Sequence, residues 1–315
     1  MTAPPASRLA PRALVLTAGL GTRLQPLTRA RAKAAAPVDG EALARRTIRW
    51  LVAQGIRDLV LNLHHKPESI TAAVGDGSDL GARVRYSWES PVLGSAGGPR
   101  RALPLIDAPF FVLVNGDTLT DVDLSAMIRH HRERGALVSM ALIVNPRPDK
   151  YGGVLLDEAG AITAFTRRGS PGPSFHFIGP QIVDASVFAG LPDGVASESV
   201  LEVYPRLMRE RPGSVVGFTG DWAFQDIGTP ADLLATSLAL AAADGRPDRP
   251  RWGRDVRVDP SAVVTRSVLW DDVTVGPGAT VHECVVADHV VIPAGARYAN
   301  SAIVASPEGL LVAPL

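Results

Sequence analysis

After residue 250 the chain repeats itself every 17 residues, and this repeat restricts the fold of that part more than any other feature. Small and β-branched residues recur about every five to six positions inside each repeat. The equivalent positions are Val256, Val273 and Val290; Val258, Val275 and Ile292; Ala262, Ala279 and Ala296; and Ser267, Cys284 and Ser301. This periodicity predicts the coils of a parallel β-helix over residues 253–315. Cys284 falls on an inward position, so we expect it to fill the core.

Strands and helices alternate in the part of the chain before this repeat. The clearest apolar, strand-like runs are residues 14–16, 59–63, 84–86, 110–114 and 138–144. Residues 43–54 and 124–134 have helical spacing, and each is followed by a glycine suited to a C-cap. The alternation predicts an α/β fold with a doubly wound, mostly parallel sheet. We expect a disordered tail at residues 1–11, a domain at 12–240, a linker at 241–252 and the β-helix domain at 253–315.

The composition limits the partners of this chain. Its 315 residues contain 32 Lys and Arg and 32 Asp and Glu, which argues against nucleic acid or an anionic membrane as a partner. No apolar run approaches the roughly 20 residues of a membrane span. The single cysteine excludes an internal disulfide and predicts a cytoplasmic protein. The seven histidines lack zinc-site spacing, and we expect them in surface or capping roles.

Residues 14–28 read LVLTAGLGTRLQPLT, an apolar run that leads into a loop with two glycines. We expect Gly19 and Gly21 to adopt positive φ angles and to bring backbone N–H groups close to a phosphate. Arg23 adds a guanidinium suited to phosphate oxygens. The Rossmann fingerprint is excluded because its third glycine is replaced by Leu24, and no Gly-Lys-Ser/Thr completes a P-loop. The basic loop continues through Lys33.

Two further segments place a carboxylate where a ligand could bind. VLVNGD, residues 112–117, is an apolar strand that ends in Asp117. FQDIGTPAD, residues 224–232, contains Asp226 and then a helix start with Thr229 as the expected N-cap. One or two carboxylates are enough to hold Mg²⁺ together with phosphates and water. The alternative for Asp117 is an Asx turn that closes the strand.

The string GLGTRLQPLT, followed by a lysine and by Pro-Val-x-Gly, resembles the signature of the sugar-1-phosphate nucleotidylyltransferases. That signature is G-x-G-T-R-L-x-P-L-T, then Pro-Lys-Pro, then Pro-Val-x-Gly. This chain keeps Lys33 but has Ala32 and Ala34 in place of the flanking prolines, which predicts a less rigid loop. The resemblance implies a Rossmann-like fold followed by a short left-handed, hexapeptide-repeat β-helix, through which we expect a homo-oligomer to assemble.

The resemblance also implies roles for individual residues. Arg23 and Lys33 are the expected catalytic residues, acting on the departing pyrophosphate and on the α-phosphate region. Asp117 and Asp226 are the expected Mg²⁺ ligands. The expected nucleotide-binding residues are Ala18, Gly19, Gly21, Thr22, Gly94, Ser95, Ala96, Gly97 and Asn115. Among these, residues 94–97 belong to LGSAGGPRRAL, which resembles the family's L-G-T-A-G segment and predicts a glycine-rich loop that opens a helix.

The segments expected to bind the sugar phosphate match the family's motifs less well than the nucleotide-binding segments do. Gly152 lies in a Tyr-Gly segment like that of the family, and Gly179 takes the place of a residue in its N-A-G-I-Y segment. The family's Glu-Lys-Pro is replaced by Arg167, Arg168 and a glycine. We expect Arg168 to bind the sugar phosphate and Arg167 to point to the other face of a strand. The alternative is a solvated basic turn.

The reaction implied by the resemblance joins an NTP and a sugar-1-phosphate, gives an NDP-sugar and pyrophosphate, and depends on Mg²⁺. LGSAGGP, residues 93–99, resembles the L-G-T-A-G-P of the mannose-1-phosphate guanylyltransferases, which favours GTP as the nucleotide. Glucose-1-phosphate or MurNAc-1-phosphate with UTP, dTTP or ATP stay open, as does a non-catalytic regulatory protein that binds nucleotide-sugars. About three short coils are too few for a β-helix acyltransferase.

Overall fold

The computed structural model describes residues 11–315, so nearly all of the expected N-terminal tail lies outside the described residues. The chain divides into two compact units. The first contains the chain up to Gly19 together with Thr47–His64 and Gly75–Phe224. The second contains Leu20–Arg46, His65–Val74 and Gln225–Leu315, so the basic loop belongs to the same unit as the β-helix.

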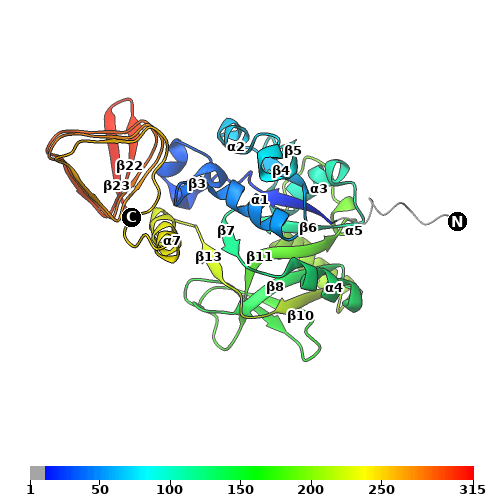
Figure 1. Ribbon diagram of the computed structural model, residues 1–315. Helices are drawn as coiled ribbons and strands as arrows, with labels where there is room; N and C mark the ends of the chain where they lie inside the picture. Colours follow the sequence, from blue (N-terminus) through cyan, green and yellow to red (C-terminus); the bar gives the residue numbers. More distant parts are fainter. Residues whose placement is uncertain (1–10) are drawn as a thin grey trace. The chain divides into compact units, whose positions relative to one another are not determined.

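A nine-stranded sheet forms the first unit (Figure 1). Its parallel part has the order β5-β4-β1-β6, made of Arg83–Trp88, Asp58–Leu63, Arg12–Leu16 and Phe110–Asn115. The long strand β11 (Phe175–Asp184) then pairs antiparallel with β6 and with β8 (Val138–Val144). The remaining strands are β9 (Gly153–Leu156), β10 (Ile162–Thr166) and β12 (Val215–Thr219), the last of which is parallel to β8. All five strands expected from apolar runs are present.

Helices cover this sheet and close its core. Helix α3 (Gly94–Ile106) packs on β1, β4 and β5, and α4 (Leu124–Arg134) packs on β8 and β11. Helix α6 (Tyr204–Glu210) follows the π-helix η6 (Ser199–Val203) and packs on β10 and β12. The other elements of the first unit are η5 (Ser78–Leu80), β7 (Thr118–Thr120) and α5 (Ser186–Ala189). Fully buried apolar residues such as Leu14, Phe111 and Met140 form the core.

The second unit begins with the basic loop, which folds into three short 3-10 helices: η2 (Thr22–Leu24), η3 (Leu27–Arg29) and η4 (Lys33–Ala35). The hairpin strands β2 (Pro37–Val38) and β3 (Glu41–Ala42) follow, and they lead into α1 (Leu43–Ala53), which continues into the first unit. Helix α2 (Pro67–Val74), strand β13 (Phe224–Asp226) and helix α7 (Pro230–Ala243) precede the repeats. Helix α7 therefore reaches just beyond residue 240, where we expected the linker to begin.

The 17-residue repeat forms a three-sided β-helix, which confirms the fold expected from its periodicity (Figure 1). Each side is a stack of three parallel strands that pair residues 17 positions apart, such as Val258 with Val275 and Val275 with Ile292. The strands are β14 (Arg257–Val258), β17 (Thr274–Val275) and β20 (Val291–Ile292); β15 (Val263–Thr265), β18 (Thr280–His282) and β21 (Arg297–Ala299); and β16 (Val268–Leu269), β19 (Val285–Val286) and β22 (Ser301–Ser306). Strand β23 (Gly309–Pro314) returns antiparallel to β22.

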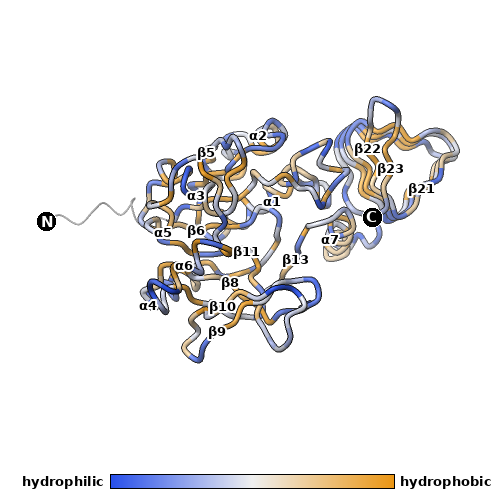
Figure 2. The backbone as a smooth tube through the Cα atoms, turned by 180° about the vertical axis from the view of Figure 1, so that it is seen from behind, coloured by the Kyte–Doolittle hydropathy of each residue, from blue (hydrophilic) through white to orange (hydrophobic). Residues whose placement is uncertain are grey.

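Apolar residues of successive coils pack together in a buried cluster. Figure 2 shows hydrophobic segments, in orange, recurring along these coils. Cys284 is fully buried among them, and this confirms its expected role as core filler. Burial raises the pKa of its thiol. Between residues 11 and 315, no helix combines the length and the apolar character that crossing a membrane requires.

Candidate functional site

A buried polar network fixes the backbone that follows β1. The N–H of Thr17 donates to Asn62 Oδ1 at 2.6 Å, and the N–H of Ala18 reaches the same oxygen at 3.3 Å. Asn62 in turn donates to Glu89 Oε1 at 2.7 Å. Asn62 is only 2% exposed, and unpaired polar groups at such depth would be costly. The network therefore sets the course of the chain toward Gly19.

Sequence reasoning missed Asn62 and Glu89. Asn62 had a signal, because it is the one amide in the otherwise apolar run LVLNL of β4. Glu89 follows β5 directly and is 3% exposed, and its second oxygen accepts the N–H of Leu93 at 2.8 Å. A Cβ at Gly98 would lie 2.5 Å from Glu89 Oε1, so only glycine fits beside this carboxylate.

The expected glycine-rich loop at residues 94–97 is helical, because α3 already begins at Gly94. The glycines instead allow another backbone segment to approach the helix. A Cβ at Gly97 would lie 2.5 Å from the carbonyl oxygen of Val195, and the Ser197 carbonyl accepts the N–H groups of Ala96 and Gly97 at 2.9 and 3.3 Å. The prediction of a loop is therefore wrong, because tertiary contacts support the helix where propensity does not.

Glu198 lies at the start of α3. The Ser95 hydroxyl and N–H both donate to Glu198 Oε2, and the Ser199 N–H donates to the Ser95 hydroxyl at 2.9 Å. A carboxylate at a helix N-terminus is favourable because the helix dipole is positive there. Glu198 is exposed, so part of its accepting capacity faces solvent. No local motif predicts this contact, because Ser95 and Glu198 are 103 positions apart in the sequence.

The turn after β6 packs against the end of β1. A Cβ at Gly116 would lie 2.5 Å from the Leu16 carbonyl oxygen. Gly179 has a φ of 113° and approaches this turn closely, since its Cβ would lie 2.7 Å from Thr118 Oγ1 and 3.4 Å from Asn115 Cβ. The first unit thus brings the predicted residues Ala18, Asn115, Asp117 and Gly179 to the carboxyl ends of parallel strands, where ligands bind in open α/β sheets.

Of the residues expected to bind the sugar phosphate, Gly152 and Arg168 are exposed to solvent. The carbonyl of Gly152 lies 3.3 Å from His176 Nδ1, and the His176 ring stacks on Tyr151 with centroids 4.3 Å apart. Strand β10 ends at Thr166, so Arg167 and Arg168 occupy a turn, and both are exposed. The expectation that they alternate across a strand is therefore wrong.

In the second unit, the basic loop folds tightly around Gly21. Gly21 has a φ of 61°, and a Cβ there would lie 2.8 Å from Thr28 Cγ2 and 3.1 Å from Lys33 Cβ. Gly19 does not adopt a positive φ, so the expectation was right for one glycine and wrong for the other. Nothing lies within 4 Å of the Cβ position at Gly19, and this leaves space for a ligand to approach its backbone.

Arg23, which lies in η2 directly after Thr22, and Asp226 meet at Gly228 within the second unit. A Cβ at Gly228 would lie 2.9 Å from Arg23 Nη1 and 3.3 Å from Asp226 Oδ2. Thr229 is the N-cap of α7, as expected, and forms a reciprocal capping box with Asp232. The rigid helix start therefore holds the short segment that carries Asp226.

Carboxylates are the candidates for a metal site. Asp117 in the first unit and Asp226 in the second are both half-buried and so reachable by a ligand. The described residues contain no cluster of three or more His, Cys, Asp or Glu side chains that could hold a metal. Two carboxylates nevertheless suit Mg²⁺, because this ion takes most of its ligands from phosphates and water.

His131 differs from the surface role expected of all histidines. It is 5% exposed, and its Nδ1 lies 3.0 Å from Ser139 Oγ. Burial lowers its pKa to about 4, so the ring is neutral at physiological pH.

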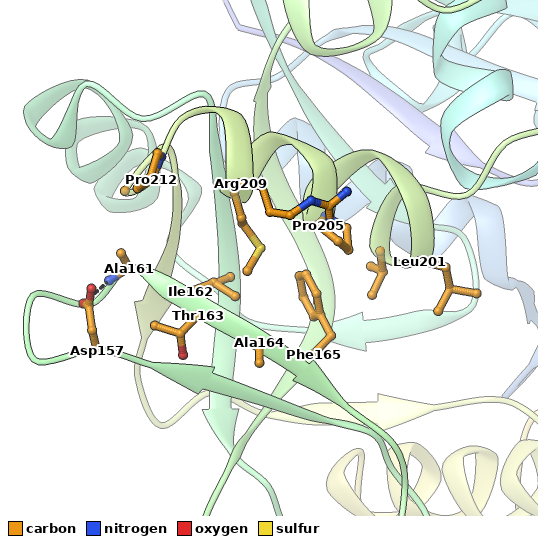
Figure 3. A pocket seen from close by; sticks show the side chains of 13 residues that line it. Asp157, Ala161, Ile162, Thr163, Ala164, Phe165, Leu201, Pro205, Arg209 and Pro212 are labelled. Carbon is orange, nitrogen blue, oxygen red and sulfur yellow. Dashed lines mark hydrogen bonds between the residues drawn. The ribbon is translucent and has the colours of Figure 1, made fainter.

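A cavity of about 580 Å³ lies elsewhere in the first unit, between β10 and the segment formed by η6 and α6 (Figure 3). Its lining is mostly apolar and includes Ile162, Phe165, Leu201 and Met208. None of the predicted site residues lines it, so it is separate from the candidate site.

Comparisons with known proteins agree with this fold. The Nucleotidyl transferase family profile matches residues 12–243, and the profile of the GlmU-like C-terminal hexapeptide matches residues 250–300. HddC from Yersinia pseudotuberculosis, crystallised in complex with GMP-PN, has a similar fold. It gives a TM-score of 0.63 at 23% identity, over 71% of this chain and 97% of that one.

Several enzymes are related in sequence. A mannose-1-phosphate guanylyltransferase of Mycobacterium tuberculosis is 30% identical over 229 residues, which are 72% of this chain but only 64% of the relative. The N-acetylmuramate alpha-1-phosphate uridylyltransferase of Neisseria meningitidis serogroup B is 32% identical over 74% of this chain and 99% of its own length. A UTP–glucose-1-phosphate uridylyltransferase of Synechocystis is 28% identical over 70% and 61%. The family profile covers most of the chain, which therefore belongs to the Nucleotidyl transferase family.

Proposed function

We propose that this chain transfers a nucleotidyl group from an NTP to a sugar-1-phosphate in the presence of Mg²⁺, and that it releases pyrophosphate. The observation that carries this proposal is that Arg23 and Asp226, far apart in sequence, both lie close to the Cβ position of Gly228. A permanent cation suits phosphate oxygens, and a carboxylate suits Mg²⁺. A site at which a triphosphate reacts needs such groups, because the negative charge of its phosphates must be neutralised.

The chemistry is a direct displacement at phosphorus. An oxygen of the sugar phosphate attacks the α-phosphorus of the NTP, the bond to the β-phosphate oxygen breaks, and pyrophosphate leaves with the bonding electrons. Catalysis then depends on positioning and charge neutralisation. Arg23 binds the departing pyrophosphate, and Lys33 neutralises the α-phosphate. Asp117 and Asp226 would hold Mg²⁺, which supplies further charge neutralisation when bound.

GTP is the nucleotide that we propose. Glu198, an exposed carboxylate that contacts Ser95 at the start of α3, can accept further hydrogen bonds, whereas both oxygens of the buried Glu89 already accept from Asn62 and Leu93. Guanine offers N1–H and N2–H₂ donors side by side, whereas uracil and thymine offer one ring N–H between two carbonyl groups. The exposed acceptor Glu198 therefore supports guanine, as does the similarity to the Mycobacterium guanylyltransferase.

Mannose-1-phosphate is the proposed acceptor, with Arg168 on its phosphate and Gly152 and Gly179 near the sugar. N-acetylmuramate-1-phosphate and glucose-1-phosphate are the competitors, because relatives of similar identity act on them. We propose a cytoplasmic homo-oligomer that assembles through the β-helix. Exposed apolar residues on its outer faces, Val263 at 53% and Val291 at 60% exposure, support such an assembly.

The test is pyrophosphate release by the full chain with GTP, UTP, dTTP and ATP, each paired with mannose-, glucose- and N-acetylmuramate-1-phosphate. We expect turnover only with Mg²⁺ present, and a kcat/KM at least tenfold higher for GTP than for UTP. Turnover with UTP alone would reassign the base. Tight binding of nucleotide-sugars without turnover of any pair would show a regulatory protein instead.

A further inference from the structure

Arg31 joins the basic loop to the β-helix within the second unit. Its Nε donates to Asp288 Oδ2 at 2.6 Å, and its Nη2 donates to Asp288 Oδ1 at 2.6 Å and to Asp271 Oδ2 at 2.7 Å. The guanidinium also lies 5.8 Å from the ring centroid of the buried Trp270. The side chains of Arg31, Asp271 and Asp288 are 20%, 14% and 10% exposed, so this Arg31 cluster is shielded from water.

The two acceptors are a product of the repeat. Asp271 and Asp288 stand 17 positions apart on successive coils, and the N–H of Asp271 donates to Asp288 Oδ1 at 3.1 Å. Burial alone would raise the pKa of Asp271, but hydrogen bonds from the Arg254 backbone and from the Arg31 and Arg254 side chains hold it below its ordinary value. The coils thus present two carboxylates to one arginine of the loop.

The loop transmits this contact to the proposed catalytic residues. Arg31 lies two positions before Lys33, and Lys33 Cβ packs against Gly21. The 3-10 helix η3, between Gly21 and Arg31, lies against β22 of the β-helix. A shift of Arg31 would therefore displace the backbone that carries Lys33.

We propose that Arg31 is a positioning residue, and that the β-helix holds the phosphate-binding loop in its productive conformation as well as serving assembly. The inference rests on the proposed function, because it gives Lys33 its role. Shielded ion pairs contribute little net stability but can select one conformation over others. Lysine would keep the charge of Arg31 but not its bidentate pair with Asp288, because an ammonium lacks the planar fork.

The experiment compares Arg31→Met, Arg31→Lys and Asp288→Asn with Arg254→Met in the full chain. Arg254 is the matched control, because it also binds Asp271, at 3.0 Å, but its side chain is 86% exposed and it belongs to the β-helix. Steady-state kinetics, the mass of the oligomer, the melting temperature and amide hydrogen exchange of residues 22–36 are measured for each variant.

We expect Arg31→Met and Asp288→Asn to lower kcat at least tenfold and to accelerate exchange in residues 22–36, with the oligomer mass unchanged. Arg31→Lys should recover part of kcat, and Arg254→Met should stay within twofold of the wild type. A kcat within twofold in Arg31→Met, or an equal loss in Arg254→Met, would overturn the proposal.

The hydrogen exchange separates this inference from the proposed function. If the wild-type protein turns over no substrate pair, the proposed function fails, and exchange alone decides whether Arg31 positions the loop. Faster exchange confined to residues 22–36 in Arg31→Met supports the positioning role. Unchanged exchange in that segment refutes it.

Discussion

Asp39 offers a quantitative test of how the second unit is held together. Its side chain is 1% exposed and accepts two hydrogen bonds from Arg246, at 2.7 and 3.2 Å, and one from the Arg251 N–H at 2.6 Å. Its own N–H donates to Ser237 in α7 at 3.1 Å. One buried carboxylate thus joins the basic loop to α7 and to the chain that enters the β-helix.

Asp39→Asn is the informative substitution. Asp39 has a φ of 46°, and asparagine tolerates this left-handed conformation whereas alanine would add strain. Asparagine also keeps the size of the side chain, so the change removes the charge and replaces one acceptor oxygen by an NH₂ group. The new NH₂ group would face the donors Arg246 and Arg251, since all their N–H groups are donors.

Removing one partner of a buried ion pair costs about 3–5 kcal/mol. Arg246 and Arg251 are 27% and 58% exposed and can turn partly toward water, so the lower end applies, about 3 kcal/mol. For a chain of 315 residues, that corresponds to a fall in melting temperature of roughly 5 °C.

The assay is thermal and urea unfolding of Asp39→Asn, with Asp244→Asn as the control. Asp244 binds the same two arginines but is 49% exposed, so its loss should lower the melting temperature much less than the loss of Asp39. If both variants unfold within 1 °C of the wild type, the buried network does not stabilise the second unit and the reasoning is refuted.

Three further outcomes follow from the candidate site and the core. Asp117→Asn should keep the melting temperature but abolish Mg²⁺-dependent pyrophosphate release; near-wild-type activity would remove Asp117 from the metal site. Arg168→Ala should raise the KM for sugar-1-phosphate about ten- to hundredfold more than that for NTP, with Arg167→Ala as its neighbour control; equal kinetics would favour a solvated turn. Because the pKa of buried His131 is lowered to about 4 from an ordinary 6.5, the folded state binds fewer protons below pH 6.5, and stability is lost as pH falls toward 4. Between pH 7 and pH 5 the wild type should lose about 2 kcal/mol more than His131→Gln, as urea midpoints would show.

The sequence predicted what depends on local pattern. Apolar runs located five of the nine strands of the sheet. The repeat predicted the register of the β-helix, because a residue that faces the core of one coil must do so in the next. Thr229 was identifiable as an N-cap because its capping partner lies three residues away. Each of these features is encoded within a short window or by an exact period.

Contacts between distant segments could not be predicted in this way. Glu198 caps the start of α3 at Ser95, and the glycines there are helical only because another segment packs on them. Arg31 appeared to be one of several basic loop residues, since nothing near it in sequence identifies its two carboxylate partners. Their positions follow from the coil geometry, which brings positions 271 and 288 together.

The alanines that flank Lys33 show why a motif departure need not loosen a structure. Ala32 has a φ of −58°, within the range that proline would impose. Its N–H, which a proline would lack, donates to Ser69 Oγ in α2 at 3.0 Å, and Ser69 itself donates to the Lys66 carbonyl at 2.7 Å. The backbone before Lys33 is therefore fixed by contacts within the second unit rather than by a ring. The expectation of a less rigid loop came from counting prolines alone, whereas here a hydrogen bond from Ala32 and the Arg31 cluster restrict the same backbone.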